Sequence, residues 1–240
     1  MVLCFAACGE QPEDVRGEQD YEYNNDTETP DDADDAENAD DVEDAEDAEN
    51  AEDEDDAEDE PEKEFDLGEV AGLTYSNEFI GIACKLPGDW TFSTDEEIAQ
   101  VNQVSEDLAG EEYKEAVAGS SAFTDMAASN GISNVNVVLQ KSTYTAVAAT
   151  DVAEAIEGTI PTLETSFEQM GYTNIDINVE KVTMDGEEYD ALVTTAEIEG
   201  FEMNQINITM KCGNYFASIT ATTLGDDLTP QEIIDCFYHI

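Results

Sequence analysis

Hydrophobic and polar residues alternate along most of the second half of the chain, with the two-residue period of half-buried β-strands. In residues 201–212, for example, Ile206, Ile208 and Met210 fall on one face of an extended chain. Four consecutive segments share this pattern and end at short turn signals, which predicts an antiparallel meander. The segments are 175–184, 187–198, 201–212 and 215–223.

Further strands are predicted before the meander. Apolar side chains alternate onto one face of residues 80–86, and Pro87-Gly88 marks the turn that follows. An Asn-Gly pair at residues 130–131, between two apolar segments, predicts a hairpin. The strands expected here are 73–77, 80–86, 122–129 and 134–142.

A period of 3.6 residues replaces the alternation elsewhere and predicts helices. Thr94 with Glu97 forms a capping box at the start of one helix, and Thr229 with Glu232 forms another at the start of the last. The helices expected are 95–108, 111–118, 151–170 and 230–237.

The longest predicted helix contains a conflict. Its apolar stripe runs in phase from Val152 to Met170, but Pro161 removes a backbone hydrogen bond and, with Gly158, should kink the helix. Because the stripe stays in phase, we expect one bent helix and not two. Strands and helices together predict an α+β fold, with an antiparallel sheet of about six to seven strands and helices packed on it as an α/β/α sandwich.

Charge divides the chain into two acidic parts. Its 240 residues contain 61 Asp and Glu against 7 Lys and Arg, a formal charge of −54. Residues 9–64 contribute −28 of this and residues 65–240 contribute −26. A polyanion of this size is repelled by nucleic-acid phosphates and by anionic lipid headgroups, which excludes both as partners. A cationic partner and a diffuse layer of divalent cations remain open.

Residues 9–64 have the composition of a disordered acidic spacer. Between residues 31 and 60, small residues recur at every third position among Asp and Glu, which gives no continuous apolar face on a helix. As a flexible coil the segment spans about 40 Å, and charge repulsion extends it further. Its spacing does not fit an EF-hand loop, so we expect weak cation condensation and no ordered calcium site.

The sequence Phe5-Ala6-Ala7-Cys8-Gly9 resembles the lipobox of bacterial lipoproteins. The resemblance implies that residues 1–8 are the remnant of a lipoprotein signal peptide ending at Cys8, whose thiol carries a lipid that anchors the protein in the membrane. Because only seven residues precede Cys8, we expect Met1 to be an internal methionine of a longer signal peptide. The alternative is that Met1 is the true start and that the protein stays in the cytoplasm.

The segment FIGIACKLPGDW, residues 79–90, resembles the entry of PsbP-like domains through Gly81, Pro87 and Trp90. The order of strand pair, helices, hairpin, long helix, meander and last helix is similar too, over roughly residues 70–240. This resemblance implies an α/β/α sandwich that acts as a non-catalytic accessory or binding module, and it transfers no site residue. The domain is also similar to uncharacterised lipoproteins of Gram-positive anaerobes, which implies the extracellular face of the cell membrane.

Candidate catalytic residues are scarce. His239 is the only histidine and lies one residue from the C-terminus, where we expect fraying and no fixed partner, so no Ser-His-acid or Cys-His set can be built. The acidic pairs Glu187-Glu188 and Asp226-Asp227 are expected by chance in so acidic a chain. We therefore assign no catalytic residue, no cofactor and no metal ligand.

The three cysteines of the predicted domain match no zinc-site spacing. We expect Cys84, Cys212 and Cys236 to be small buried apolar residues. A Cys212–Cys236 bridge is the alternative, because export permits disulfides. Trp90 is expected to pack in the core and not to line a ligand groove.

These observations favour a cell-surface lipoprotein whose folded domain, residues 65–240, is a non-catalytic binding or accessory module held off the membrane by the acidic spacer. An unknown protein or wall partner with cationic character fits the charge. The alternative is an exported hydrolase that acts on cell-wall polymer or peptide. That enzyme needs convergent carboxylates in a deep pocket, with at least one pKa raised by burial.

Overall fold

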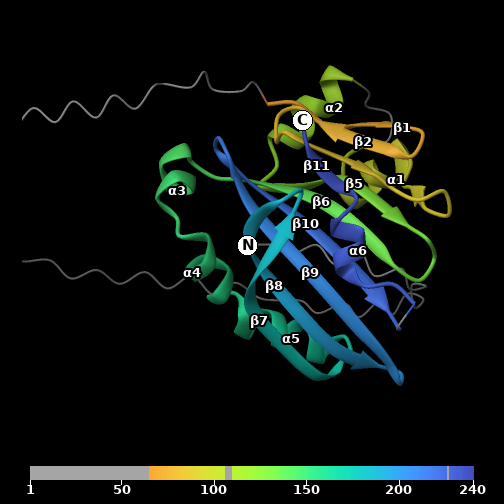
Figure 1. Ribbon diagram of the computed structural model, residues 1–240. Coiled ribbons are helices and arrows are strands. Elements are labelled where there is room, and N and C mark those ends of the chain that lie inside the picture. Colours follow the sequence, from red (N-terminus) through yellow and green to blue (C-terminus); the bar gives the residue numbers. More distant parts are fainter. Residues whose placement is uncertain (1–64, 106–109, 226) are drawn as a thin grey trace, which may run out of the picture. The chain divides into compact units, whose positions relative to one another are not determined.

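The computed structural model describes residues 65–105, 110–225 and 227–240 (Figure 1). Within these ranges it contains helices and antiparallel sheets, so the predicted α+β class is confirmed. The predictions for Cys8 and for the acidic segment 9–64 fall outside the described residues.

Seven strands of the described residues form one antiparallel sheet, in the order β4-β5-β6-β10-β9-β8-β7. The expected hairpin forms β5 and β6, with β4 beside β5, and the expected meander forms the other four strands, so both predictions are confirmed. The strands are β4 (Thr91–Phe92), β5 (Ala122–Ser129), β6 (Asn134–Lys141), β7 (Thr173–Met184), β8 (Glu187–Ile198), β9 (Phe201–Cys212) and β10 (Tyr215–Leu224).

Two tight turns set the register of the meander. Asp185 and Gly186 have φ angles of 50° and 86°, and Glu199 and Gly200 have φ angles of 52° and 86°. Two successive positive φ angles are the pattern of a type I′ turn, whose twist matches that of paired strands. The strands therefore pair from the turn residues onward, as the Asp-Gly and Glu-Gly signals predict.

A second antiparallel sheet, with four strands among the described residues, has the order β1-β2-β3-β11. The expected strand pair 73–77 and 80–86 lies in this sheet and not in the large one, so the interpretation as a single sheet is wrong for that pair. The strands are β1 (Glu69–Ala71), β2 (Thr74–Asn77), β3 (Ile82–Lys85) and β11 (Phe237–His239).

The last segment of the chain also differs from its prediction. The capping box of Thr229 and Glu232 is present, but the helix that it starts ends at Ile234. The chain then becomes β11, in which Phe237 pairs with Cys84 of β3. Phe237 is thus buried by sheet formation and not on a helix face. Its position in the sequence is compatible with either a helix or a strand.

The helix expected at 111–118 is confirmed, but the other expected helices are shorter than the sequence period predicts. The helix expected at 151–170 is two helices, because Gly158 caps the first and Pro161 lies in the first turn of the second, where its missing N–H costs nothing. The expectation of one bent helix is therefore wrong. The helices are α1 (Asp95–Val101), α2 (Glu111–Ala118), α3 (Tyr144–Ala149), α4 (Val152–Glu157), α5 (Ile160–Gln169) and α6 (Pro230–Ile234).

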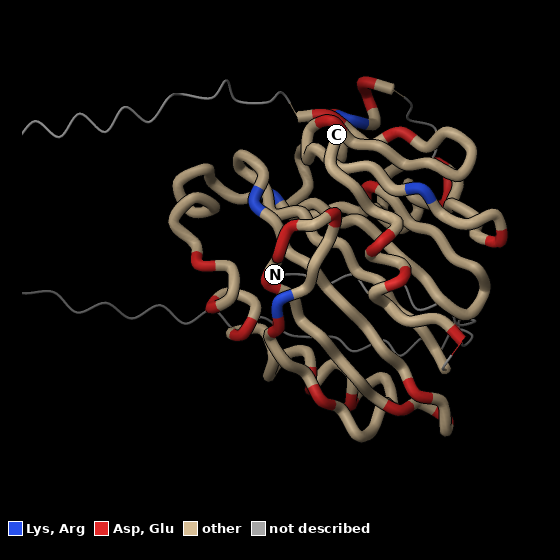
Figure 2. The backbone as a smooth tube through the Cα atoms, viewed as in Figure 1, with Lys and Arg blue, Asp and Glu red and all other residues tan. Residues whose placement is uncertain are grey.

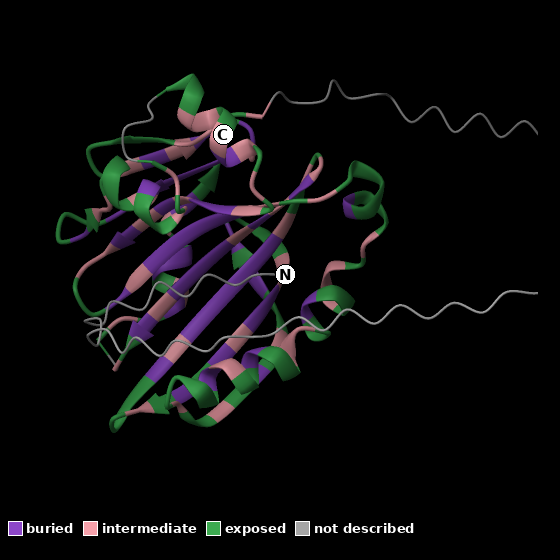
Figure 3. Ribbon diagram, turned by 180° about the vertical axis from the view of Figure 1, so that it is seen from behind, coloured by how far each residue is buried: buried purple, intermediate pink, exposed green. Residues whose placement is uncertain are grey.

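Different elements cover the two faces of the large sheet. Leu192 and Ala196 of β8 pack in one apolar cluster with α4 and α5, whereas Ala191, on the opposite face, joins the main core. Ile82 and Phe237 of the small sheet belong to that main core as well. Figure 3 shows the buried residues concentrated along the strands of the large sheet. Helices therefore pack on one side of β8, and the small sheet contributes to the core on the other.

The first described residues are packed into this core. The ring of Phe65 stacks on Tyr215 with centroids 5.2 Å apart and meets Phe79 and Phe123 edge-on, at 5.5 Å and 5.8 Å. Such aromatic pairs stabilise by about 1 kcal/mol each beyond the area that they bury. This packing fixes the chain just before Gly68 and brings it alongside β5.

Candidate functional site

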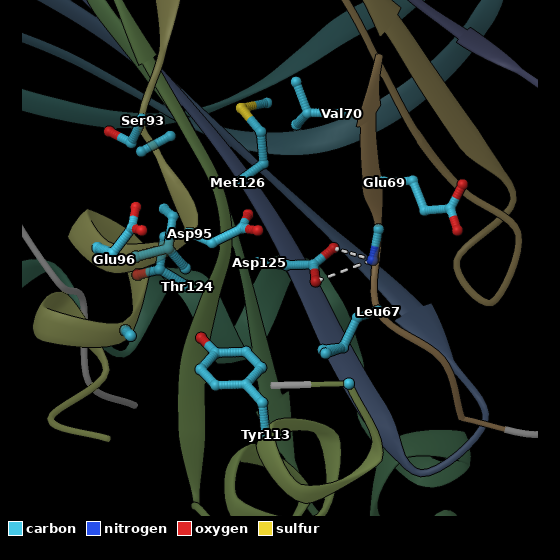
Figure 4. A pocket seen from close by; sticks show the side chains of 15 residues that line it. Leu67, Glu69, Val70, Ser93, Asp95, Glu96, Tyr113, Thr124, Asp125 and Met126 are labelled. Atoms are coloured by element: carbon cyan, nitrogen blue, oxygen red, sulfur yellow. Dashed lines mark hydrogen bonds between the residues drawn. The ribbon is translucent and has the colours of Figure 1, made fainter. Parts of the chain in front are cut away.

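A cavity of about 530 Å³ opens among β1, β5, α1 and α2 (Figure 4). Its lining combines apolar side chains, such as Leu67 and Met126, with the carboxylates of Asp95, Glu96 and Asp125. Figure 2 shows acidic residues spread widely over the described chain, but here they border a concave site with apolar walls. This combination is the usual composition of a small-ligand site.

A β-bulge in β5 positions Asp125. The pairing of β5 with β6 shifts register between Thr124 and Met126, so the residue between them is turned out of the regular ladder. Its Oδ2 atom accepts hydrogen bonds from the Tyr75 hydroxyl at 2.6 Å and from Asn77 Nδ2 at 2.8 Å. The carboxylate thus joins the large sheet to β2 of the small sheet.

The backbone of Gly68 completes the environment of Asp125. Its N–H donates to both carboxylate oxygens, at 3.0 Å to Oδ1 and 3.1 Å to Oδ2. Among the described residues Oδ1 has no other donor, although a carboxylate oxygen can accept two hydrogen bonds. One acceptor position on Oδ1 is therefore left for a ligand in the cavity that Asp125 lines.

The protein environment changes the acidity of this carboxyl group. Burial raises the pKa of Asp125 above its ordinary value, and the hydrogen bonds from Tyr75, Asn77 and Gly68 oppose that rise only in part. Burial likewise raises the pKa of the Tyr75 hydroxyl, and the Asp125 charge adds to the effect. A cation near Asp125 would favour the ionised carboxylate, so the site is electrostatically suited to positive charge.

Two further carboxylates come from the first turn of α1. Asp95 points into the cavity toward Asp125, whereas Glu69, on β1, extends away from it (Figure 4). Asp95 and Glu96 stabilise the helix N-terminus through its dipole. Within the described residues neither side chain forms a hydrogen bond or an ion pair. Both remain available to a ligand.

Tyr113 of α2 supplies a hydroxyl group to the lining. Its oxygen accepts a hydrogen bond from Asn102 Nδ2 at 2.9 Å. Asn102 is fixed in turn by the backbone of Thr124, to which it donates at 2.8 Å and from which it accepts at 2.7 Å. The phenolic proton of Tyr113 has no acceptor among the described residues, so it can be donated to a ligand.

The donor set does not fit a metal ion. No group of three or more His, Cys, Asp or Glu side chains in the described parts of the chain converges closely enough to hold one. The nearby Lys114 is paired with Asp66, whose Oδ1 lies 3.1 Å from the Lys114 Nζ. Spaced carboxylates beside apolar walls suit an organic cation, such as an ammonium or guanidinium group, better than a bare ion.

Sequence reasoning missed this site. The partners of Asp125 lie about 50 residues away in the chain, at Gly68, Tyr75 and Asn77. One local signal exists: an acid interrupts the apolar alternation of Phe123 and Met126, and the phase of the alternation changes across it. That signal indicates a bulge, but it does not indicate what the carboxylate contacts.

The prediction that His239 lacks fixed partners is wrong. It lies in β11, where its backbone N–H donates to Asp185 Oδ2 at 2.8 Å and its ring Nδ1 lies 3.1 Å from the same oxygen. Its Nε2 lies 2.7 Å from the Tyr189 hydroxyl. Burial and the nearby Glu187 raise the pKa of Tyr189 to about 12, which opposes its use as a nucleophile. The cluster fastens the C-terminal strand to the turn between β7 and β8.

The remaining predicted candidates stay outside the cavity. Glu187 hydrogen-bonds to Tyr189, Glu188 faces another part of the surface, and Asp226 is outside the described residues. Cys84 is buried, as expected, whereas Cys212 and Cys236 are half-buried beside the main core, so the prediction is wrong for these two; no disulfide joins the three described cysteines, so the alternative Cys212–Cys236 bridge is absent as well. Burial raises the pKa of the Cys84 thiol well above its ordinary value. Trp90 is buried in the core, as predicted, although it also borders a concave surface.

Comparisons with known proteins do not identify a family. No family model matches the chain, and no curated protein matches it. Among solved structures, a crystal structure from Bacteroides thetaiotaomicron aligns with a TM-score of 0.37 and 10% identity. The alignment covers 71% of this chain and 49% of that one, so the chain spans about half the length of the structure that it matches.

Helices long and apolar enough to cross a membrane are absent from the described residues.

Proposed function

We propose that the protein is a lipid-anchored cell-surface protein whose folded domain is a non-catalytic binding module. The cavity beside Asp125 takes the ammonium or guanidinium group of a small organic cation or of a partner side chain. Cys8 carries the lipid, and the acidic segment 9–64 holds the domain away from the membrane on the extracellular face.

One observation carries the binding assignment. Asp95, Glu96 and Asp125 line one cavity, together with apolar side chains and the hydroxyl of Tyr113. Oδ1 of Asp125 has one acceptor position left there. Each acceptor can receive an N–H bond, and charge-assisted bonds of this kind are the stronger ones. The charge of −26 on residues 65–240 adds a long-range attraction for cations.

The lipid anchor and the domain family are supported by sequence. The lipobox at residues 5–9 supports acylation of Cys8, and the acidic segment behind it fits a spacer. The motif at residues 79–90 supports a PsbP-like domain, as in Gram-positive lipoproteins. Such an accessory module requires a partner and no catalytic group.

An exported hydrolase of wall polymer or peptide is the second candidate. The raised pKa of Asp125 beside Asp95 favours it, because glycosidases pair an acid with a carboxylate. Against it, Asp125 already accepts hydrogen bonds from Tyr75, Asn77 and Gly68, and a general acid must donate its proton to substrate. Release of products from wall fragments, abolished by Asp95→Asn, would favour the hydrolase over the binding module.

The binding assignment predicts the effect of removing two charges. We expect the full chain to bind Nα-acetyl-lysine methylamide, whose side-chain ammonium group stays charged. The double variant Asp95→Asn/Glu96→Gln should bind it about tenfold more weakly, because each ion pair between a carboxylate and the ammonium group contributes up to about 1 kcal/mol. Isothermal titration calorimetry at low salt measures the affinity. Binding should also tighten as the pH rises through the raised pKa of Asp125.

A matched control removes the same net charge elsewhere. Glu164 and Glu168 are exposed residues of α5, away from the cavity lining. The variant Glu164→Gln/Glu168→Gln should keep the affinity of the unaltered chain. Equal weakening in both double variants would show attraction by net charge alone, and absence of binding to the unaltered chain would contradict the proposed site.

A further inference from the structure

A second concave surface adjoins the acidic cavity. It has a volume of about 500 Å³ and lies between the turn that follows β1 and the strand β4. Val70, Leu73, Trp90 and Phe92 give it apolar walls. We call this surface the apolar groove.

The apolar groove and the acidic cavity share one wall. Val70, Ser93, Asp95 and Glu96 line both spaces. A ligand whose charged group meets Asp95 in the cavity can therefore extend past the same residue into the groove. The two spaces form one site with an acidic part and an apolar part.

Two large apolar side chains in the groove are exposed. Val70 is 47% exposed and Leu73 is 38% exposed, whereas Trp90 of the same lining is 4% exposed. Exposed apolar residues that gather on a concave surface indicate an interaction site. Covering them would remove apolar area from water, which favours binding.

The strands at this site leave backbone groups free. β1 is the edge of the small sheet and β4 is the edge of the large sheet, so within the described residues each pairs with a strand on one side only. Extended peptides bind to such edges through main-chain hydrogen bonds, and pockets select alternate side chains. A peptide can therefore form main-chain hydrogen bonds with these strand edges, which a free amine cannot.

We propose that the site binds an extended cationic peptide segment in which a basic residue and an aliphatic residue are two positions apart. The inference rests on the proposed function, because the basic side chain occupies the acidic cavity. Successive side chains of an extended chain point to opposite sides, so residues i and i+2 face the same way. That spacing presents both groups to the same side at the shortest separation along the chain, which suits two spaces that share a wall.

Two peptides of identical composition test the spacing. In one, acetyl-Ala-Lys-Ala-Leu-Ala-amide, lysine and leucine are two apart, and in the other, acetyl-Ala-Lys-Leu-Ala-Ala-amide, they are adjacent. Calorimetry with the full chain should show that the first peptide binds at least tenfold more tightly than Nα-acetyl-lysine methylamide. The second peptide should bind about as weakly as the lysine derivative.

A groove variant separates the two parts of the site. Leu73→Ser removes an exposed apolar group that lines the apolar groove and not the acidic cavity, so we expect the first peptide to lose most of its gain while the lysine derivative binds unchanged. A thermal unfolding curve verifies that this variant is folded. If the lysine derivative binds and both peptides bind no better, the peptide inference is overturned and the proposed function stands. If the two peptides bind equally tightly, the spacing is wrong, and if none of the three probes binds, the proposed function fails as well.

Discussion

Replacing Asp125 with alanine should lower the free energy of unfolding by about 3 kcal/mol. The substitution removes the acceptor of two buried donors, the Tyr75 hydroxyl and the Asn77 amide, which are 0% and 1% exposed as residues. Each unsatisfied buried donor costs about 1–3 kcal/mol, and relief of the carboxylate's own burial offsets part of the sum. Urea unfolding followed by circular dichroism measures the loss.

Asp89→Ala is the matched control for this substitution. Asp89 is exposed and has no hydrogen bond or ion pair within the described residues. We therefore expect its substitution to change the free energy of unfolding by no more than about 0.5 kcal/mol. A loss below 1 kcal/mol for Asp125→Ala would show that the contacts of Asp125 do not stabilise the junction between the two sheets.

The pH dependence of stability in the isosteric variant Asp125→Asn tests the raised pKa of Asp125 independently. Because burial raises the pKa of Asp125 in the folded state, the folded protein binds this proton more tightly than the unfolded chain does. The stability from this group is therefore fully present below the ordinary pKa of 3.8 and is lost as the pH rises through the raised value. Asp125→Asn should remove that component, so its difference from the unaltered chain should depend on pH in this window. A difference that stays constant across the window would contradict the raised pKa.

The variant Gly68→Ala should be the second most damaging single change, with a loss of about 3 kcal/mol. A Cβ atom on Gly68 would overlap the ring of Tyr75 and lie 2.6 Å from Asp125 Oδ2. The Tyr75 ring is fully buried, so it has no free space to move into. Overpacking of this kind typically costs 1–3 kcal/mol, and here it also disturbs the Gly68 hydrogen bonds to the carboxylate.

Gly88→Ala separates this steric effect from the general effect of replacing glycine. At Gly88 the nearest heavy atom, Cδ1 of Leu73, would be 4.0 Å from the new Cβ, an ordinary contact. We expect the free energy of unfolding of that variant to lie within about 0.5 kcal/mol of that of the unaltered chain. If Gly68→Ala is equally mild, the chain before β1 does not pack against β5 as described.

Local signals predicted those parts of the fold in which pairing partners are adjacent in sequence. The meander followed from alternation together with Asp185-Gly186 and Glu199-Gly200, because these turns determine register without distant contacts. Helix starts at Thr94 and Thr229 were predicted correctly for a similar reason, since a capping box is completed within four residues.

Elements that depend on distant partners could not be predicted in this way. Phe237 is in helical phase with Ile233 and Ile234, and only its pairing with Cys84 makes it a strand residue. Pro161 fits a kink and a helix start equally well until Gly158 is seen to end the preceding helix. The local pattern permits both outcomes, and tertiary packing selects one.

The candidate site was beyond sequence reasoning for a related reason. Asp125 receives its hydrogen bonds from the segment containing Gly68, Tyr75 and Asn77, and Asp95 comes from a third segment. Among 31 acids in residues 65–240, no local feature marks those that border a cavity. The charge predicts a cationic partner, and the cavity beside Asp125 is where we propose that its positive group binds.

Attachment of the domain to the cell surface is the central claim, and the N-terminus of the native protein tests it most directly. Mass spectrometry of the N-terminal peptide, from protein extracted out of the cells that produce it, reports cleavage and acylation together. We predict a chain that begins at Cys8 and carries a diacylglycerol thioether on that residue. A peptide that retains Met1 and has an unmodified Cys8 thiol would contradict it.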